Sequence, residues 1–448
     1  MKHNSLLSYK AHTRSLTALG FPIIIGQIGT IVQGLADTIM TGQYNSEALA
    51  SAGFVNNVMN LILVFALGYS YGLTPVVGSY HARAEHDHIG QSLRSSLQAN
   101  GMMATIVLLL MGTLYFFLSD LGQPEELLPI IRPYYLVILA SLPFQILFNA
   151  YKQFFDGISK TQIAMWVMIG ANVFNILGNW LLIYGVGPFP ELGLLGAGIS
   201  TLLSRIGMLL FMVGIFHFRE QFALYHKGFH SKENSKALRK QLHQLGMPIG
   251  LQMGMECASF SLCAVIQGWI GTSALAAHQV MTNVASVCYM IYYGIGASVA
   301  IRISHFNGMK DLANVRRCAF AGYRMTLVCG IFLSAVIVFF RNEISSFFTN
   351  DPSVSAIVMS LMVPFVLYQI GDGLQTNFAN ALRGIADVKP MMRYAFISYI
   401  IISLPLSYFL GIKFQWGPVG IWMAFPIALS VAGMLFYWRF NKKVPSQS

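Results

Sequence analysis

Apolar stretches long enough to cross a lipid bilayer recur along the whole of this chain. A membrane-spanning helix needs about 20 mainly apolar residues, and twelve stretches of the 448-residue sequence meet that requirement. The predicted spans are 16–41, 47–78, 91–118, 128–155, 160–185, 192–218, 241–270, 276–304, 315–340, 353–382, 390–412 and 417–440. This pattern predicts an all-α polytopic membrane protein with twelve transmembrane helices.

Composition excludes most other classes of protein. Only 10% of the residues are charged and 55% are hydrophobic, whereas about a quarter of the residues in soluble domains are charged. The net charge of +11 raises the possibility of a nucleic-acid partner, but the basic residues lie in short loops between apolar runs, so we expect none. The five cysteines form no Cys-x-x-Cys pair, which argues against a disulfide framework or a zinc site.

The basic residues are distributed unevenly between the loops. Of the 28 Lys and Arg residues, 24 lie in the termini and in every second loop, three lie in the alternate loops, and Arg205 lies within a span. Loops rich in Lys and Arg remain in the cytoplasm. Both termini are therefore expected in the cytoplasm, which requires an even number of spans.

The second half of the chain repeats the first. Leu-Gly-x-Pro-Ile occurs at 19–23 and again at 245–249, and Gly157-Ile158 recurs at nearly the same spacing as Gly384-Ile385. The repeat predicts two pseudo-symmetric six-helix lobes in the same orientation, with substrate bound between them. The expected lobes are residues 1–218 (spans 1–6) and 241–448 (spans 7–12), joined by a cytoplasmic linker at 219–240.

Three acidic residues lie deep within predicted spans: Asp37, Glu256 and Asp372. Ionisable side chains inside a membrane are costly and usually functional. A buried carboxylate without a cationic partner takes up a proton or finds a cation, which suits a cation-coupled transporter. The alternative is a neutral, protonated acid hydrogen-bonded to a neighbouring helix.

Polar residues one helical turn away lie on the same face as two of these acids. Tyr368 precedes Asp372 by four residues, and Gln252 precedes Glu256 by four, so each pair shares a helix face. Hard cations such as sodium prefer carboxylate, hydroxyl and amide oxygens. These pairs are therefore candidates for binding a coupling cation.

For other polar residues within spans, the sequence gives weaker indications of a functional role. Asn175 and Asn179 share a face of the fifth span; they are placed to hydrogen-bond Asp37 or to bind a cation, although asparagine pairs also join membrane helices structurally. For Arg205, a structural pairing is favoured over contact with an anionic substrate. His278 is interpreted as hydrogen-bonded, with a protonation switch as the alternative.

The sequence lacks the motifs of ATP-driven pumps and of zinc proteases. No Gly-Lys dipeptide occurs, which excludes the Walker A loop of an ATPase. No His-Glu-x-x-His motif of a zinc protease occurs either. A membrane enzyme would need a cluster of polar residues at one membrane interface, and the sequence shows none. We therefore expect neither enzymatic activity nor a cofactor.

Taken together, these motifs resemble the multidrug and toxic compound extrusion (MATE) family, in its NorM-like branch. Asp37, within residues 34–42, matches the acid of the family's first-helix motif, and Glu256 and Asp372 match acids of the second lobe. Tyr368 matches the tyrosine one turn before the latter aspartate. DinF-like archaeal members carry an aspartate where this chain has Asn179, which makes a purely N-lobe proton mechanism less secure.

The resemblance also implies roles for further residues. It places Asn175 and Asn179 opposite the first-helix acid. It further implies a substrate cavity, which we expect to be lined by Gln279, Tyr289, Gln252 and Met253.

The resemblance implies antiport in the bacterial inner membrane. Sodium or protons entering would drive export of amphipathic, often cationic organic compounds by a monomer embedded in lipid, and Asp37, Glu256 and Asp372 would be the ligands if sodium is the coupling ion. Two alternatives from the same superfamily remain open, a flippase for a lipid-linked saccharide and a dedicated metabolite exporter. A channel is disfavoured because no loop resembles a selectivity filter.

Overall fold

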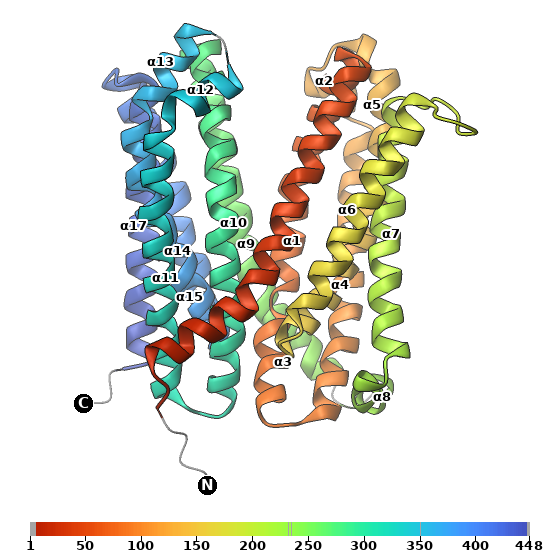
Figure 1. Ribbon diagram of the computed structural model, residues 1–448, viewed down its shortest axis with the longest axis vertical. Helices are drawn as coiled ribbons and strands as arrows, with labels where there is room; N and C mark the ends of the chain where they lie inside the picture. Colours follow the sequence, from red (N-terminus) through yellow and green to blue (C-terminus); the bar gives the residue numbers. More distant parts are fainter. Residues whose placement is uncertain (1–5, 232, 234, 350, 446–448) are drawn as a thin grey trace. The chain divides into compact units, whose positions relative to one another are not determined.

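The computed structural model describes residues 6–231, 233, 235–349 and 351–445. Most of these residues are helical, and none of them forms a strand (Figure 1). The helices are α1 (Tyr9–Tyr44), α2 (Ser46–Ser70), α3 (Leu73–Ala82), α4 (His86–Tyr115), α5 (Leu128–Gly157), α6 (Thr161–Tyr184), α7 (Leu194–Phe218), α8 (Ala223–His230), α9 (Ser235–Ile270), α10 (Thr272–Gly308), α11 (Leu312–Phe339), α12 (Arg341–Phe348), α13 (Pro352–Ser360), α14 (Met362–Gly384), α15 (Lys389–Ala395), α16 (Leu404–Tyr408) and α17 (Gly417–Lys443). Short 3-10 turns lie at Leu118–Leu121, Glu125–Leu127 and Glu220–Phe222, and π-helical turns at Phe396–Ser403 and Phe409–Lys413.

The expected membrane-spanning architecture is confirmed. Eleven helical segments of the described chain are long and apolar enough to cross a membrane, and the bent pair α13–α14, with 46° between its helices, makes a twelfth. The second span consists of α2 and α3 together. The chain is thus an all-α, multi-pass membrane protein, as its apolar pattern predicts.

Three predicted spans are interrupted in the structure, each shortly before a proline. α2 ends at Ser70 and α3 begins at Leu73, just before Pro75. The bend between α13 and α14 precedes Pro364, and a π-helical segment ends shortly before Pro405. Proline lacks the backbone donor that continues a helix, which favours an interruption at these places, although Pro22, Pro143 and Pro248 lie inside continuous helices.

The helices pack into two compact units that divide the chain differently from the expected lobes. We call Ile25–Gly250 the N-unit, and Met1–Ile24 with Leu251–Ser448 the C-unit. Helices α1 and α9 each begin in one unit and continue in the other. The expected linker at 219–240 contains α8 and the first turns of α9. The lobe boundaries at 218 and 241 stay a prediction, and residues 1–5 and 446–448, at the two termini expected in the cytoplasm, lie outside the described residues.

The repeated Leu-Gly-x-Pro-Ile motif lies where α1 and α9 pass between units. In the C-unit, a Cβ added to Gly20 would lie 3.0 Å from the backbone oxygen of Gly294. In the N-unit, a Cβ added to Gly246 would lie 2.4 Å from the backbone oxygen of Tyr69. Each glycine therefore allows one helix backbone to approach another, and the repeat marks two matching contacts.

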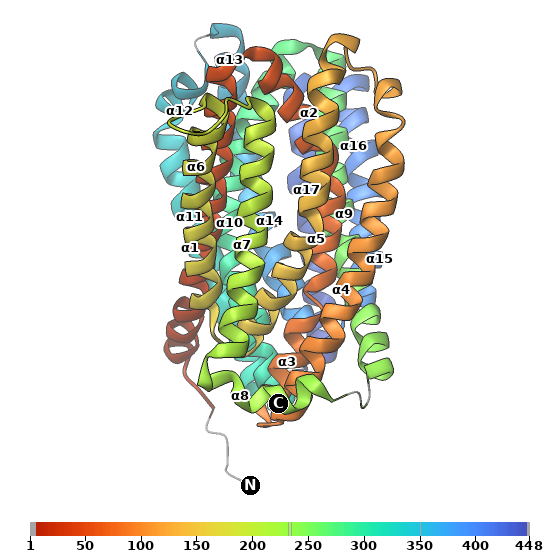
Figure 2. The same ribbon diagram turned by 90° about the vertical axis from the view of Figure 1, so that its right-hand side faces the viewer.

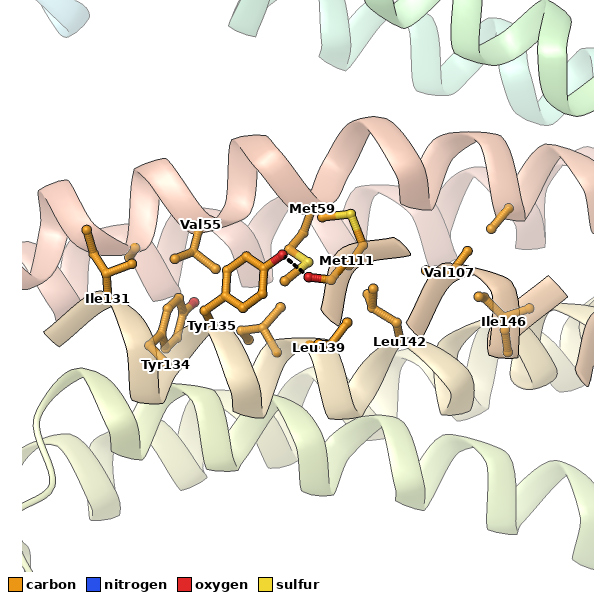
Figure 3. Packing of buried hydrophobic residues seen from close by; sticks show 14 of the residues in the cluster. Val55, Met59, Val107, Met111, Ile131, Tyr134, Tyr135, Leu139, Leu142 and Ile146 are labelled. Carbon is orange, nitrogen blue, oxygen red and sulfur yellow. Dashed lines mark hydrogen bonds between the residues drawn. The ribbon is translucent and has the colours of Figure 1, made fainter. Parts of the chain in front are cut away.

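The N-unit has a well-packed core between α2, α4 and α5 (Figure 3). Val55, Leu139 and Met111 are almost completely buried, and the ring of Tyr135 lies among them. Its hydroxyl donates to the backbone oxygen of Met111 at 2.7 Å. A buried tyrosine needs such a partner, so this bond fixes α5 against α4.

Candidate functional site

In the N-unit, Asp37 on α1 is held by two asparagines of α6. Asn179 Nδ2 donates to Asp37 Oδ1 at 2.5 Å. With the Asn175 amide oriented so that both of its atoms are satisfied, Nδ2 donates to the same oxygen at 2.9 Å and Oδ1 accepts from Thr201 Oγ1 at 3.2 Å. Both asparagines are fully buried, and their four-residue spacing places both amides on Asp37. The contact expected from the sequence is present.

Helix α7 supports this arrangement. Ser200 donates to the backbone oxygen of Asn175 at 2.8 Å, which joins α7 to α6 directly behind the asparagine pair. Arg205, one of the cations within a span, donates to Ser141 Oγ of α5 at 2.7 Å. Arg205 therefore has the kind of structural pairing that the sequence favours.

In the C-unit, Glu256 on α9 accepts hydrogen bonds from two glutamines. Gln252 Nε2 donates to Oε2 at 2.9 Å, and Gln375 Nε2 of α14 donates to Oε1 at 2.8 Å. The first bond follows from the four-residue spacing within α9. The second joins α9 to α14 and brings Glu256 near the helix that carries Asp372.

Gln252 also connects Glu256 to a buried arginine that the sequence pattern assigns to a cytoplasmic loop. Arg383, at the end of α14, donates to Gln252 Oε1 at 2.8 Å and to Asn380 Oδ1 at 3.3 Å. Arg383 is 7% exposed and Gln252 is 1% exposed. Gln252, which was expected in the substrate cavity, is buried between a carboxylate and a guanidinium.

Asp372 is the most deeply buried of the three acids. It is 1% exposed, and Thr376 Oγ1 donates to its Oδ1 at 3.3 Å. Its Oδ2 is buried and accepts no hydrogen bond from the described part of the chain. A buried carboxylate oxygen without a donor is unfavourable unless it binds a proton or a cation.

Aromatic side chains surround the turn of α14 before Asp372. Tyr368 is 4% exposed, and its ring lies 6.2 Å from the rings of both Phe260 and Trp422. The apolar neighbours exclude water from this part of α14. Electrostatic interactions are stronger at low dielectric, so neutralising Asp372 with a proton or a cation has a larger effect here than at a surface.

The other predicted site residues lie on α9 and α10 in different surroundings. Gln279 is exposed, Met253 is half-buried, and the half-buried Tyr289 packs against Tyr293 with 6.2 Å between ring centroids. His278 is buried against Trp422, and its Nδ1 has no hydrogen-bond partner among the described residues. The roles of Gln279, Tyr289, Gln252 and Met253 in a substrate cavity stay predictions.

A buried ion pair in the N-unit was not predicted from the sequence. Lys152 Nζ lies 2.9 Å from Asp156 Oδ2 on α5, with both side chains nearly inaccessible. The repeat could have pointed to it, because Asp156 precedes Gly157-Ile158 as Arg383 precedes Gly384-Ile385. Each half thus buries a charged residue at the same position of its fourth span.

The described residues include neither an accessible serine in a hydrolase-like motif nor a cluster of metal-binding side chains. Residues 68–72 read Gly-Tyr-Ser-Tyr-Gly, the spacing of a hydrolase nucleophile, but Ser70 is buried and donates to Asn100 Oδ1 at 2.6 Å. No three His, Cys, Asp or Glu side chains of the described residues come together as a metal site.

The fold and the buried acids define a polytopic α-helical transporter. Residues 22–181 and 248–409, one stretch in each half, match the MatE family model. The chain therefore belongs to the MatE family, as the sequence motifs predict, and is a transporter rather than an enzyme.

Known proteins resemble the chain over nearly its whole length. The multidrug resistance protein NorM of Vibrio cholerae is 28% identical to it, with 96% of each chain covered. A probable multidrug resistance protein NorM of Bradyrhizobium diazoefficiens is 29% identical, covering 94% of this chain and 92% of that protein. The crystal structure of the eukaryotic MATE transporter AtDTX14 shares the fold, with a TM-score of 0.89 at 16% identity and coverage of 97% and 98%.

Proposed function

We propose that this protein exports small amphipathic, often cationic organic compounds in exchange for sodium or protons, by alternating access. The NorM relatives, whose names include multidrug resistance, support the export of organic compounds. The observation that carries the coupling is the buried Asp372, whose Oδ2 lacks a donor among the described residues. Either coupling ion would satisfy that oxygen.

The acids of the C-unit provide the chemistry that coupling requires. Glu256 has one donor on each carboxylate oxygen, and a carboxylate oxygen can accept more than one hydrogen bond or bind a cation as well. With Asp372, Tyr368 and Thr376 nearby on α14, carboxylate and hydroxyl oxygens suited to sodium are present. If sodium is the ion, we infer that Glu256 and Asp372 bind it and that Tyr368 positions it.

Binding of the coupling ion would neutralise a charge that attracts a cationic substrate. The ion and the substrate would then compete for the same carboxylates. A transporter that changes conformation with either one bound would exchange one for the other. Asp37, held by Asn175 and Asn179 in the N-unit, is a second place where a proton or sodium would act in this way.

We further propose that the protein lies in the bacterial inner membrane with both termini in the cytoplasm, and that it functions as a monomer in contact with lipid. The alternation of Lys- and Arg-rich loops supports this orientation. The bacterial origin of the NorM relatives supports the location.

Transport by the purified protein in vesicles tests the proposal. We would measure efflux of a fluorescent organic cation under an imposed sodium gradient and, separately, under a pH gradient, with protein-free vesicles as the control. Efflux driven by sodium alone would assign coupling to Glu256, Asp372 and Tyr368. Efflux driven only by pH would assign it to carboxylate protonation and give Asp37 a larger part.

The absence of a response to either gradient, with folded protein, would overturn the proposal. It would favour the flippase or the dedicated metabolite exporter instead. If Asp372→Asn and Glu256→Gln variants both retain full gradient-driven efflux, the coupling role of the C-unit acids is wrong.

A further inference from the structure

A shallow basic cavity, wide open to the surface, lies in the N-unit between α4 and the start of α9. Its volume is about 500 Å³. It is lined by Met102, Lys236, Arg239, Lys240, His243 and Gln244. None of these residues is acidic, and none belongs to the sites around Asp37, Glu256 or Asp372. Figure 2 shows the first turns of α9 beside the lower part of α4.

The first turns of α9 have two faces. Leu238 and Leu242 are buried, whereas Lys236 and Lys240 are exposed. These spacings follow the helical period, so the lysines project away from the packed face. The N-terminal end of a helix also carries a partial positive charge. The cavity therefore concentrates positive charge on a helix that is fixed on its other side.

His243 is held by a buried partner. The hydroxyl of Tyr69 lies 2.5 Å from His243 Nδ1, and Tyr69 is 3% exposed. With the phenol donating to Nδ1, the ring proton lies on Nε2, and this N–H is a donor on a residue that lines the cavity. At the start of α9, Ser235 Oγ donates to Gln98 Oε1 of α4 at 3.3 Å, and this bond joins the two helices at the cavity.

An exposed apolar face leads away from the basic residues along α4. Met102 is 53% exposed, Ile106 is 57%, and Leu109 is 67%. α4 is long and apolar enough to span a membrane, so these exposed side chains offer apolar surface to an acyl chain. On α9, Met247, one turn after His243, is also exposed. Positive charge at one end and apolar surface along the helix match an anionic headgroup with its acyl chains.

We propose that this cavity binds an anionic phospholipid, with the phosphate at Lys236, Lys240 and His243 and an acyl chain along Met102 and Ile106. In the proposed orientation the lipid belongs to the cytoplasmic leaflet, where anionic lipids interact with basic residues near membrane helices. The inference rests on the charge and exposure of these residues and does not depend on the coupling ion or the exported compound.

Native mass spectrometry of the purified protein in detergent tests the site. We would titrate dioleoylphosphatidylglycerol and dioleoylphosphatidylcholine separately and compare the apparent Kd values of the first bound lipid. The anionic lipid is expected to bind more tightly. In a Lys236→Gln/Lys240→Gln variant its affinity should fall about 25-fold, since each lysine near an anionic lipid contributes roughly fivefold. Affinity for the zwitterionic lipid should change little.

A Lys442→Gln/Lys443→Gln variant is the matched control. It removes the same charge from the exposed end of α17 and should retain the affinity for phosphatidylglycerol. Equal weakening in both double variants would mean that net charge alone attracts the lipid, which would overturn the site. Equal binding of the two lipids by the unaltered protein would also overturn it.

A second experiment distinguishes a phospholipid from a free phosphate. Glycerophosphoglycerol, which has the same phosphodiester without acyl chains, should not displace phosphatidylglycerol at comparable concentration, and in the same way glycerol phosphate should not compete. A Met102→Ser/Ile106→Ser variant should bind the lipid more weakly. Displacement by either soluble compound at equal concentration, with no effect of the serine variant, would show a site for soluble phosphates and would contradict the proposal.

Discussion

The two halves of this protein make the same contact between their first and fifth spans, but with different chemistry. In the N-unit, Asp37 of α1 accepts from Asn179 of α6. In the C-unit, the position equivalent to Asp37 is Cys263 of α9, because the two are as far apart in the sequence as the two Leu-Gly-x-Pro-Ile motifs. By nearly the same offset, Ser407 of α16 is equivalent to Asn179. Cys263 Sγ and Ser407 Oγ are 3.3 Å apart. A carboxylate and an amide in one half therefore correspond to a thiol and a hydroxyl in the other.

The acids of the C-unit have no acidic counterparts in the N-unit. Glu256 corresponds to Thr30 at the spacing of the Leu-Gly-x-Pro-Ile motifs, and Asp372 corresponds to Gln145 at the spacing of the repeated Gly-Ile pair. The repeat has thus kept the packing positions while the charges have diverged. Symmetry explains the shared position of the Asp37–Asn179 and Cys263–Ser407 contacts. It does not explain which of them holds a charge, and the positions where charge differs between the halves are the best candidates for function.

The largest difference between equivalent positions of the two halves is expected in the rate of efflux, between Asp372→Asn and Gln145→Ala. The Asp372→Asn change keeps the shape of the side chain but removes its ability to take up a proton or a cation. We expect gradient-driven efflux from vesicles to fall to the level of protein-free vesicles. Gln145→Ala, at the corresponding position of the N-unit, is the control and should retain most of the rate. Equal loss in both variants would mean that the position matters for packing and not for charge.

The buried Lys152–Asp156 ion pair can be compared with Arg383 of the other half by measuring the free energy of unfolding. Lys152→Met leaves Asp156 buried without its cation, which should cost about 3–5 kcal/mol of unfolding free energy. Arg383→Met, at the position corresponding to Asp156, loses hydrogen bonds to neutral amides, with an expected cost of about 1.5–3 kcal/mol. Equilibrium unfolding in mixed micelles would measure both.

A double variant isolates the charge effect at this pair. Lys152→Met/Asp156→Met replaces both ions with apolar groups and should lie within about 1 kcal/mol of the parent protein. If the double variant is as unstable as Lys152→Met, the cost arises from packing, and the buried charge is not its cause.

Local features of the sequence predicted the spans and the positions of the three acids. Apolar runs and the four-residue helical spacing are properties of neighbouring residues, so the Gln252–Glu256 pair and the shared face of Asn175 and Asn179 could be recognised. The contact of the two asparagines with Asp37 was one of two possibilities that the sequence left open, and the family resemblance implied it.

Contacts between distant segments could not be predicted in the same way. Gln375 of α14 donates to Glu256 of α9, far away in the sequence, and no local pattern specifies that pairing. Arg383 lies at the end of an apolar run, where basic residues are usually solvated, so it was expected in a loop. Its burial depends on how α9 packs against α14, and the division of α1 and α9 between units likewise depends on packing that the repeat alone does not specify.

A smaller difference is expected between the Asp37–Asn179 and Cys263–Ser407 contacts. Asn179→Ala removes a hydrogen bond to a carboxylate, which should cost about 1.5–3 kcal/mol. Ser407→Ala removes only a weak bond to a thiol and should cost about 1 kcal/mol or less. Thermal unfolding of both variants in one detergent would give the order. A larger loss for Ser407→Ala would contradict the view that only the N-unit contact involves a charge.

The smallest difference concerns the glycines of the repeated motif. In Gly246→Ala the new methyl group would lie 2.4 Å from a backbone oxygen of α2, and relieving that overlap should cost about 1–3 kcal/mol. In Gly20→Ala the nearest backbone oxygen is 3.0 Å away, and the better helix propensity of alanine offsets part of the strain, so a change below about 1 kcal/mol is expected. Melting temperatures of the two variants would compare these contacts directly. Equal losses would mean that both contacts are equally tight and that the two halves differ in charge but not in packing.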